Sequence, residues 1–264
     1  MYLQFSDEKI ITSRDNPSIK LFMKLMSSKK ARVQYRMFVL EGGRLVFDAI
    51  KSNAPVRKIF VTESALEKNR ERFEELDFPE AEIICISDEL GDRISGTDKT
   101  QGVFAQCGFI DRTDSISKLK KHGRYAVLYQ LQDPGNAGTI IRTGEGAGIG
   151  GVFLTKTCVI RATMGSVFRI PVFHDVSADD VFMALADAQI QPFAAVIDSD
   201  AENIKNVDFS DGGAIFIGNE GNGLPKETVE KCGRKVTIKM SGNTDSLNAA
   251  MATGIMMWEL MKYE

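Results

Sequence analysis

The chain has 264 residues, of which 43% are hydrophobic and 26% are charged, and its formal net charge is −3. This composition is ordinary for a soluble globular protein, and no apolar run reaches the roughly 20 residues that cross a bilayer. The first 14 residues mix charged and apolar side chains and contain no signal-peptide core, so we expect a cytoplasmic protein without a membrane segment. The length suits two domains better than one.

The cysteines and histidines exclude several kinds of site. The cysteines are scattered and form no Cys-x-x-Cys pair: Cys85, Cys107, Cys158 and Cys232. Isolated thiols of this kind favour neither zinc nor iron–sulfur ligation. With only His122 and His174, a histidine-based metal site or a Ser-His-Asp triad is poorly supplied, and we expect no metal.

The charge is distributed unevenly along the chain. Residues 1–58 hold 12 Lys and Arg against 5 Asp and Glu, a balance of +7, and the remaining residues hold 21 against 31, a balance of −10. Six of the basic residues stand in one stretch: Lys20, Lys24, Lys29, Lys30, Arg32 and Arg36. Such a stretch suits a module that contacts phosphates, but a solvated helix face explains it equally well.

The amino-terminal part predicts a small α/β unit, which we expect to form a domain over residues 1–110. Apolar residues at Ile19, Phe22, Met23 and Met26 have the spacing of an amphipathic helix over 16–26. A basic turn or helix continuation follows, and then strand 37–40, helix 42–51, strand 56–62, helix 63–76 and strands 81–86 and 102–107. Residues 111–123 are polar and predict a linker.

From residue 124 onward, strands and helices alternate. The predicted elements are strand 125–131, helix 136–146, strand 152–155, helix 178–189, strands 193–197 and 213–217, helix 225–231, strand 235–239 and helix 246–262. This alternation predicts an α/β domain over 124–264, with a parallel sheet covered by helices on both faces. Gly146, Gly148 and Gly151 fit G-x-G-x-x-G, but they end a helix instead of opening one, so we interpret them as a helix C-cap and turn.

Three segments carry most of the functional information. They are residues 136–142 (Asn-Ala-Gly-Thr-Ile-Ile-Arg), 217–224 (Ile-Gly-Asn-Glu-Gly-Asn-Gly-Leu) and 238–248 (Ile-Lys-Met-Ser-Gly-Asn-Thr-Asp-Ser-Leu-Asn). Each places polar side chains or glycines where a predicted strand ends and a helix begins. Because ligands bind at the carboxyl ends of strands in open α/β sheets, the three segments predict one composite pocket.

Each segment also has a purely structural interpretation. Asn136 is a good N-cap, Ser246 could cap the last helix, and the glycines around Glu220 could form a simple turn. Arg142 is harder to explain in this way, because a guanidinium beside an apolar helix face needs a carboxylate, a phosphate or a carbonyl. A pairing with Glu145 or Glu220 is the structural alternative to a functional role.

In these segments the chain resembles the SpoU (TrmH-like) family of RNA ribose 2′-O-methyltransferases, in the SPOUT superfamily, over residues 124–264. Residues 13–44 also resemble that family's substrate-binding domain, which is similar to a small ribosomal protein. The resemblance implies a carboxyl-terminal α/β knot, in which the last segment threads a loop as a deep trefoil knot, and a small amino-terminal α/β RNA-binding domain. It further implies a homodimer through the carboxyl-terminal domain.

The resemblance also assigns the site. By position, three residues match the contacts to the cofactor S-adenosylmethionine: Gly218, Ile238 and Leu247. Five match the polar active-site set: Asn136, Arg142, Glu220, Ser246 and Asn248. No histidine lies in the motifs to act as a base, and in the family the arginine that matches Arg142 is proposed to help deprotonate the hydroxyl. Because a guanidinium is a poor base, we favour the alternative that Arg142 stabilises the developing alkoxide, with Asn136 and Glu220 fixing its orientation.

The implied reaction is methyl transfer to a ribose 2′-hydroxyl of structured RNA, ribosomal rather than transfer RNA. The alternatives are a tRNA 2′-O-methyltransferase, a non-catalytic RNA-binding or ribosome-assembly factor on the same fold, and a methyltransferase for protein or small molecules. The chain departs from the family pattern at Lys239, where proline is common. It also departs at residues 154–161, where relatives carry a longer polar loop.

Overall fold

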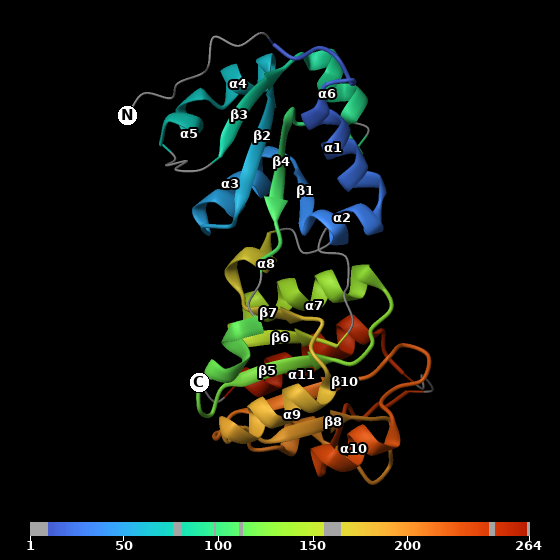
Figure 1. Ribbon diagram of the computed structural model, residues 1–264. Helices are drawn as coiled ribbons and strands as arrows, with labels where there is room; N and C mark the ends of the chain where they lie inside the picture. Colours follow the sequence, from blue (N-terminus) through green and yellow to red (C-terminus); the bar gives the residue numbers. More distant parts are fainter. Residues whose placement is uncertain are drawn as a thin grey trace. The chain divides into compact units, whose positions relative to one another are not determined.

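The computed structural model describes residues 10–75, 81–97, 99–110, 113–155, 165–242 and 246–262. The chain forms two compact units, Met1–Ile110 and Asp111–Glu264, which Figure 1 shows in colours that follow the sequence. Within the described residues, the first unit has a four-stranded sheet and the second a seven-stranded sheet. No helix of the described part is long and apolar enough to span a membrane.

The first unit is built on a mixed sheet with the strand order β1-β4-β2-β3. Its strands are β1 (Met37–Glu41), β2 (Val56–Thr62), β3 (Glu82–Ile86) and β4 (Val103–Gly108). Strand β4 runs antiparallel to β1 and β2, whereas β2 and β3 are parallel. The helices of this unit are α1 (Pro17–Ser27), α2 (Lys29–Tyr35), α3 (Gly43–Lys51), α4 (Glu63–Lys68), α5 (Arg70–Glu75) and α6 (Asp88–Ile94).

Helix α1 forms because its start and its apolar stripe agree. The Asn16 side chain accepts a hydrogen bond from the Ser18 N–H at 2.9 Å, and Pro17 opens the first turn. The stripe buries Phe22 completely, and its ring meets the rings of Phe60 and Phe104 edge-to-face at centroid distances of 5.6 Å. Burying one such side chain contributes about 1.5–3 kcal/mol, so this contact fixes α1 on the sheet.

The second unit contains a fully parallel sheet with the strand order β7-β6-β5-β10-β8-β11-β9. The strands are β5 (Arg124–Leu128), β6 (Gly151–Leu154), β7 (Val172–His174), β8 (Pro192–Ala195), β9 (Glu202–Asn203), β10 (Gly213–Ile217) and β11 (Arg234–Thr237). The chain first builds outward from β5 to β7. It then continues on the other side of β5, with β10 beside it. The strand order therefore changes direction between β5 and β10.

Helices cover both faces of this sheet. They are α7 (Pro134–Ala147), α8 (Ser166–Arg169), α9 (Ala178–Asp187), α10 (Lys226–Cys232) and α11 (Ala249–Met261), with the 3₁₀ helices η1 (Thr113–Lys118) and η3 (Ile204–Asn206). In Figure 1, α9 lies in front of the sheet and α11 lies behind it. Val127, Phe153 and Phe216 point into the core on the α9 side, whereas α11 packs against α7, β5 and β10. Both faces are thus buried, which explains the near-continuous apolar strands.

The predicted fold class is confirmed in its layers: a parallel sheet with helices on both faces follows a smaller α/β unit. The deep knot stays a prediction.

The helix predicted over 63–76 is two helices, split at Asn69, whose side chain donates to the Ala65 carbonyl. Part of the expected linker belongs to the second unit, because Ile116 and Leu119 pack against its core. The C-cap interpretation is confirmed: Gly148 ends α7 with a φ of +84°.

Candidate active site

Loops that follow neighbouring strands meet at the carboxyl edge of the seven-stranded sheet. The change of strand direction between β5 and β10 creates the kind of crevice in which open α/β sheets bind ligands. A cleft of about 660 Å³ opens at this edge. Six of the eight predicted site residues line it: Gly218, Glu220, Ile238, Ser246, Leu247 and Asn248. The structure therefore brings the second and third segments together around one cavity.

A chain of side-chain hydrogen bonds ties the first segment to the other two. The Nδ2 group of Asn248 donates to Oδ1 of Asn136 at 3.0 Å. The Nδ2 group of Asn136 in turn donates to Oε1 of Glu220 at 3.1 Å. Asn136 is 9% exposed, so both ends of its amide are committed to these partners in a nearly buried position. One buried amide thus links the starts of α7 and α11 to the loop after β10.

Glu220 is the acceptor at the end of this chain. Its carboxylate also accepts from the N–H groups of Gln132 at 2.9 Å and Asp133 at 3.1 Å, in the loop after β5. Partial desolvation opposes the charge, but the hydrogen bonds from Gln132, Asn136 and Asp133 outweigh it and hold the pKa of Glu220 below its usual value. Glu220 is therefore an ionised acceptor at neutral pH and a weak base.

The loop after β10 is a compact hairpin rather than an open glycine-rich turn. Asn219 and Gly223 exchange backbone hydrogen bonds of 3.1 and 2.9 Å, and the Asn219 side chain donates to the Gln130 carbonyl at 2.9 Å. Gly218 has to be a glycine, because a Cβ there would lie 2.2 Å from the carbonyl carbon of Gly223. This glycine lets the two backbone segments of the loop approach each other closely beside the cleft.

Arg142 does not line the cleft, and the expectation that Asn136 and Glu220 fix its orientation is wrong within one chain. The Arg142 side chain is exposed and makes no hydrogen bond or ion pair to the part of the chain that the structure describes. The reason is helical geometry. Six residues advance a helix by about 9 Å and one and two-thirds turns, so Asn136 and Arg142 face different directions from α7.

Glu145, the proposed structural partner of Arg142, has a different partner. Arg169 at the end of α8 binds it with two nitrogens, Nε to Oε1 and, at 3.0 Å, Nη2 to Oε2. This hydrogen bond from Arg169, helped by Ser166 and by the charge of Arg142, holds the pKa of Glu145 below its usual value. Because both oxygens of the Glu145 carboxylate accept from Arg169, Glu145 forms no hydrogen bond or ion pair with Arg142.

This arrangement predicts a compensating pair of substitutions. In Arg169→Gln, Glu145 loses its partner and can pair with Arg142 three residues earlier on α7. Exposed pairs are worth up to about 1 kcal/mol, so for the methyl transfer that the sequence resemblance implies we expect kcat to fall roughly two- to fivefold. Arg169→Gln combined with Glu145→Gln should restore kcat, as measured by methyl incorporation under saturating RNA. A double variant as slow as Arg169→Gln alone would show that Arg169 acts only by holding α8.

The start of α11 differs from the prediction. Asn248, not Ser246, is its N-cap, and its Oδ1 accepts from the N–H groups of Ala250 at 2.9 Å and Met251 at 3.3 Å. At α7 the cap is Asp133 instead of Asn136, and Pro134 stands at the first helical position. Asn136 is thereby free to accept from Nδ2 of Asn248, while Oδ1 of Asn248 caps α11. Ser246 and Leu247 are exposed residues of the cleft wall.

Sequence reasoning missed several residues of this region. Gln130 adopts a left-handed backbone conformation, with a φ of +51°, and receives Asn219 on its carbonyl. Residues 195–197, at the end of β8, form another wall of the cleft, and Ile197 is 79% exposed. The signal for the latter was available, because β8 is a parallel strand of the same sheet and its carboxyl end must reach the same edge. The short connection 154–161 lies largely outside the described residues.

The groups that line the cleft suit an organic ligand that has one polar and one apolar part. Within the described residues, no group of three or more His, Cys, Asp or Glu side chains could hold a metal ion. The walls combine apolar side chains, such as Ile238, Leu247 and Met256, with backbone groups of the glycine-containing hairpin. Such a lining binds a flat ring by contact and a polar tail by hydrogen bonds to the backbone.

The fold and the cleft define an α/β protein with its ligand site at a topological switch point. Residues 123–258 match the model of the SpoU rRNA Methylase family, and residues 16–105 match that of the MRM3-like substrate binding domain. The first match covers more than half of the chain. The chain therefore belongs to the SpoU rRNA methylase family, as its three segments had indicated.

Relatives share both units. The chain is 27% identical to the 23S rRNA (guanosine(2553)-2′-O)-methyltransferase RlmP of Bacillus subtilis, over 96% of this chain and 99% of that protein. An uncharacterized tRNA/rRNA methyltransferase of Synechocystis is 28% identical over 100% of this chain and 97% of its own length. Among solved structures, the AdoMet-bound rRNA methyltransferase from Sinorhizobium meliloti has a TM-score of 0.83 at 29% identity, covering 97% of this chain and 98% of that one.

Proposed function

We propose that this protein transfers a methyl group from S-adenosylmethionine to a ribose 2′-hydroxyl of RNA. The hydrogen-bond chain from Asn248 through Asn136 to Glu220 carries this proposal, because it assembles three distant segments around one cleft. Its support outside the structure is the similarity, over almost the whole chain, to an enzyme named for 2′-O-methylation of rRNA.

The residues of the cleft fit S-adenosylmethionine. Ile238 and Leu247 offer apolar contacts to the adenine ring, and the backbone around Gly218 offers hydrogen-bonding groups at close range. The volume of about 660 Å³ lies within the range of roughly 300–1,000 Å³ typical of cofactor sites. When bound, this cofactor supplies a methyl group that its positively charged sulfur makes electrophilic. The protein has to align the hydroxyl, whose proton passes to solvent water.

Arg142 is the residue we assign to the developing negative charge on the ribose oxygen. Glu220 is unsuited to the role of base, because its oxygens already accept hydrogen bonds and its pKa is lowered. A guanidinium stays protonated in proteins, so Arg142 acts as a donor and not as a base. Its planar fork can bind the ribose oxygen and a neighbouring phosphate together. Asn136, Ser246 and Asn248 hold the loops and the wall of the cleft around the hydroxyl.

We also propose that the protein forms a homodimer, in which Arg142 of one subunit lies at the cleft of the other. On α11, Met251, Ile255 and Trp258 are 60%, 37% and 67% exposed, and their spacing places them on one face of the helix. A stripe of large apolar side chains in water marks a contact surface. A second copy of the same chain covers it in a two-fold dimer, since such an interface is self-complementary. Arg142 of one subunit then serves the cleft of its partner.

Ribosomal RNA is the substrate class we favour over tRNA, because RlmP is named for 23S rRNA and also matches the amino-terminal unit. Since ribosomes of bacteria lie in the cytoplasm, a ribosomal substrate places the proposed activity in the cytoplasm. Two experiments test the proposal. Incorporation of labelled methyl from S-adenosylmethionine into RNA separates an enzyme from a non-catalytic assembly factor. Mapping 2′-O-methyl sites in RNA from cells with and without this gene then separates ribosomal from transfer RNA.

A further inference from the structure

One segment of the amino-terminal unit is basic and contains no acidic residue. Residues 16–40 include six Lys and Arg but no Asp or Glu. The apolar face of α1 is buried, which leaves Lys20 and Lys24 on its exposed side, and α2 continues with Lys29 and Lys30, also exposed. Positive charge that no acid in the same segment neutralises attracts phosphates. The structure separates the cations that stabilise the fold from those that remain available.

Arg32 has a structural role at this corner. Its Nη1 group donates to the carbonyls of Leu25 at 2.8 Å and Met26 at 3.1 Å, so it fixes α2 against the end of α1. Lys20 is also occupied, by an ion pair of 2.8 Å with Asp15. Lys29 and Lys30, by contrast, have no hydrogen bond or ion pair to any residue that the structure describes. Two adjacent lysines on a rigid corner are therefore left for an external anion.

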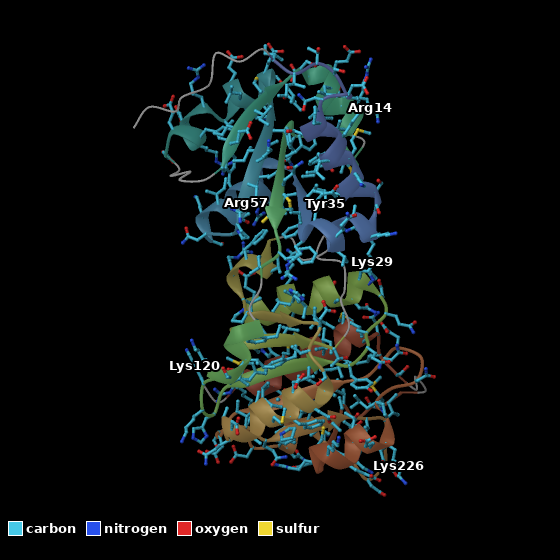
Figure 2. All side chains as sticks on the ribbon, in the orientation of Figure 1. Arg14, Lys29, Tyr35, Arg57, Lys120 and Lys226 are labelled. Atoms are coloured by element: carbon cyan, nitrogen blue, oxygen red, sulfur yellow. The ribbon has the colours of Figure 1, made fainter. Side chains whose placement is uncertain are left out.

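An exposed aromatic ring stands beside Lys24. Tyr35, the last residue of α2, is 42% exposed, and Lys24 Nζ lies 5.3 Å from the centroid of its ring. Figure 2 labels Lys29 and Tyr35, the two ends of this short helix. Proteins that bind single-stranded RNA combine cations for the backbone with aromatic rings on which unpaired bases stack. A base within a duplex is covered by its neighbours and cannot reach such a ring.

We infer that the α1–α2 corner, defined by Lys24, Lys29, Lys30 and Tyr35, binds unpaired nucleotides of the RNA substrate. The lysines hold phosphates, and the ring of Tyr35 stacks on one base. The inference rests on the proposed function for the nature of the ligand. It assigns the recruiting surface to the start of the chain, and it names a loop, bulge or single strand as the element that this surface selects.

The two kinds of contact have different signatures in a binding experiment. The full-length protein is titrated into a fluorescent oligouridylate of about 12 nucleotides at several salt concentrations. In Lys29→Gln/Lys30→Gln, the slope of log K against log salt should shrink by about 1.4, because two phosphate contacts are lost. In Tyr35→Ala, affinity should fall roughly tenfold with the slope unchanged, whereas Tyr35→Phe should bind like the wild type.

Matched controls keep the inference falsifiable. Lys68→Gln/Arg70→Gln removes the same charge from exposed positions of α4 and α5 and should leave the slope at the wild-type value. Thermal unfolding of every variant checks the fold. The inference is overturned if both double variants change the slope equally, if Tyr35→Ala binds normally, or if an RNA duplex of equal length binds as tightly. Equal competition by poly-L-glutamate would also overturn it, since the surface would then bind acidic protein.

Failure here is distinguishable from failure of the proposed function. If the wild-type protein incorporates no methyl into RNA, the methyltransferase proposal fails. If it does incorporate methyl, and Lys29→Gln/Lys30→Gln leaves the RNA concentration for half-maximal rate unchanged, only the assignment of this surface fails. The expected outcome is a raised half-maximal concentration with kcat unchanged, because the corner lies in a different unit from the cleft.

Discussion

Arg142→Ala is expected to lower kcat about 10²- to 10³-fold, the loss typical when one donor to a developing negative charge is removed. Because the side chain is exposed and has no hydrogen bond in the described part of its own chain, the free energy of unfolding should change by no more than about 0.5 kcal/mol. Steady-state methyl incorporation and thermal unfolding, measured on the same preparation, check the two halves of this expectation.

Arg142→Lys separates charge from geometry. It keeps the positive charge but loses the planar fork, so most of the loss should persist. Lys226→Ala, an exposed cation on α10, is the matched control and should behave like the wild type. If Arg142→Lys retains most of its turnover, a point charge suffices and the assigned bidentate role is wrong. If Arg142→Ala is fully active, the residue has no part in the chemistry.

For the proposed homodimer, Trp258→Glu is expected to convert the protein to a monomer and to lower its activity by about tenfold or more, the loss typical of an aromatic anchor at the centre of an interface. Trp258 is 67% exposed in the isolated chain, so the substitution buries no charge in the monomer and should leave its fold intact. Sedimentation velocity gives the mass, and methyl incorporation at the same protein concentration gives the activity.

A second exposed apolar residue serves as the control for this result. Met183 on α9 is 60% exposed and lies outside the α11 stripe, so Met183→Glu should remain dimeric and active. Mixing Trp258→Glu with inactive Arg142→Ala protein should not restore turnover, because Trp258→Glu cannot form a mixed dimer with it. A wild-type protein that sediments as a fully active monomer would contradict the assignment of Arg142 to the partner's cleft.

The parts of the fold that were predictable are those in which local sequence and tertiary environment agree. Strand β10 was predicted with its observed bounds because a run of apolar residues between glycines has few alternatives. The contact between the amino-terminal ends of α7 and α11 could not be predicted from the sequence. Asn136 and Asn248 were each visible as polar residues at helix starts, but the contact between them joins positions 112 residues apart.

The errors have local physical causes. Helix α7 begins earlier than predicted because Asp133 caps it and Pro134 suits the first turn, a signal that the sequence contained. Strands β7 and β9 have three and two residues and are stabilised by pairing with their neighbours in the sheet. Segments this short show no periodic pattern from which a strand can be predicted. Glu145 pairs with Arg169 instead of Arg142 because α8 brings a two-pronged guanidinium to it, which sequence spacing could not show.

The position of the transferred methyl group is the most direct test of the assigned chemistry. The protein is incubated with unmodified ribosomal RNA and S-adenosylmethionine carrying a deuterated methyl, and the RNA is digested to nucleosides for mass spectrometry. A cleft that aligns a ribose hydroxyl beside Arg142 predicts the label on the sugar, as a 2′-O-methylnucleoside, and its loss in Arg142→Ala. A label on a base, or none in any RNA from a protein that binds the cofactor, would contradict it.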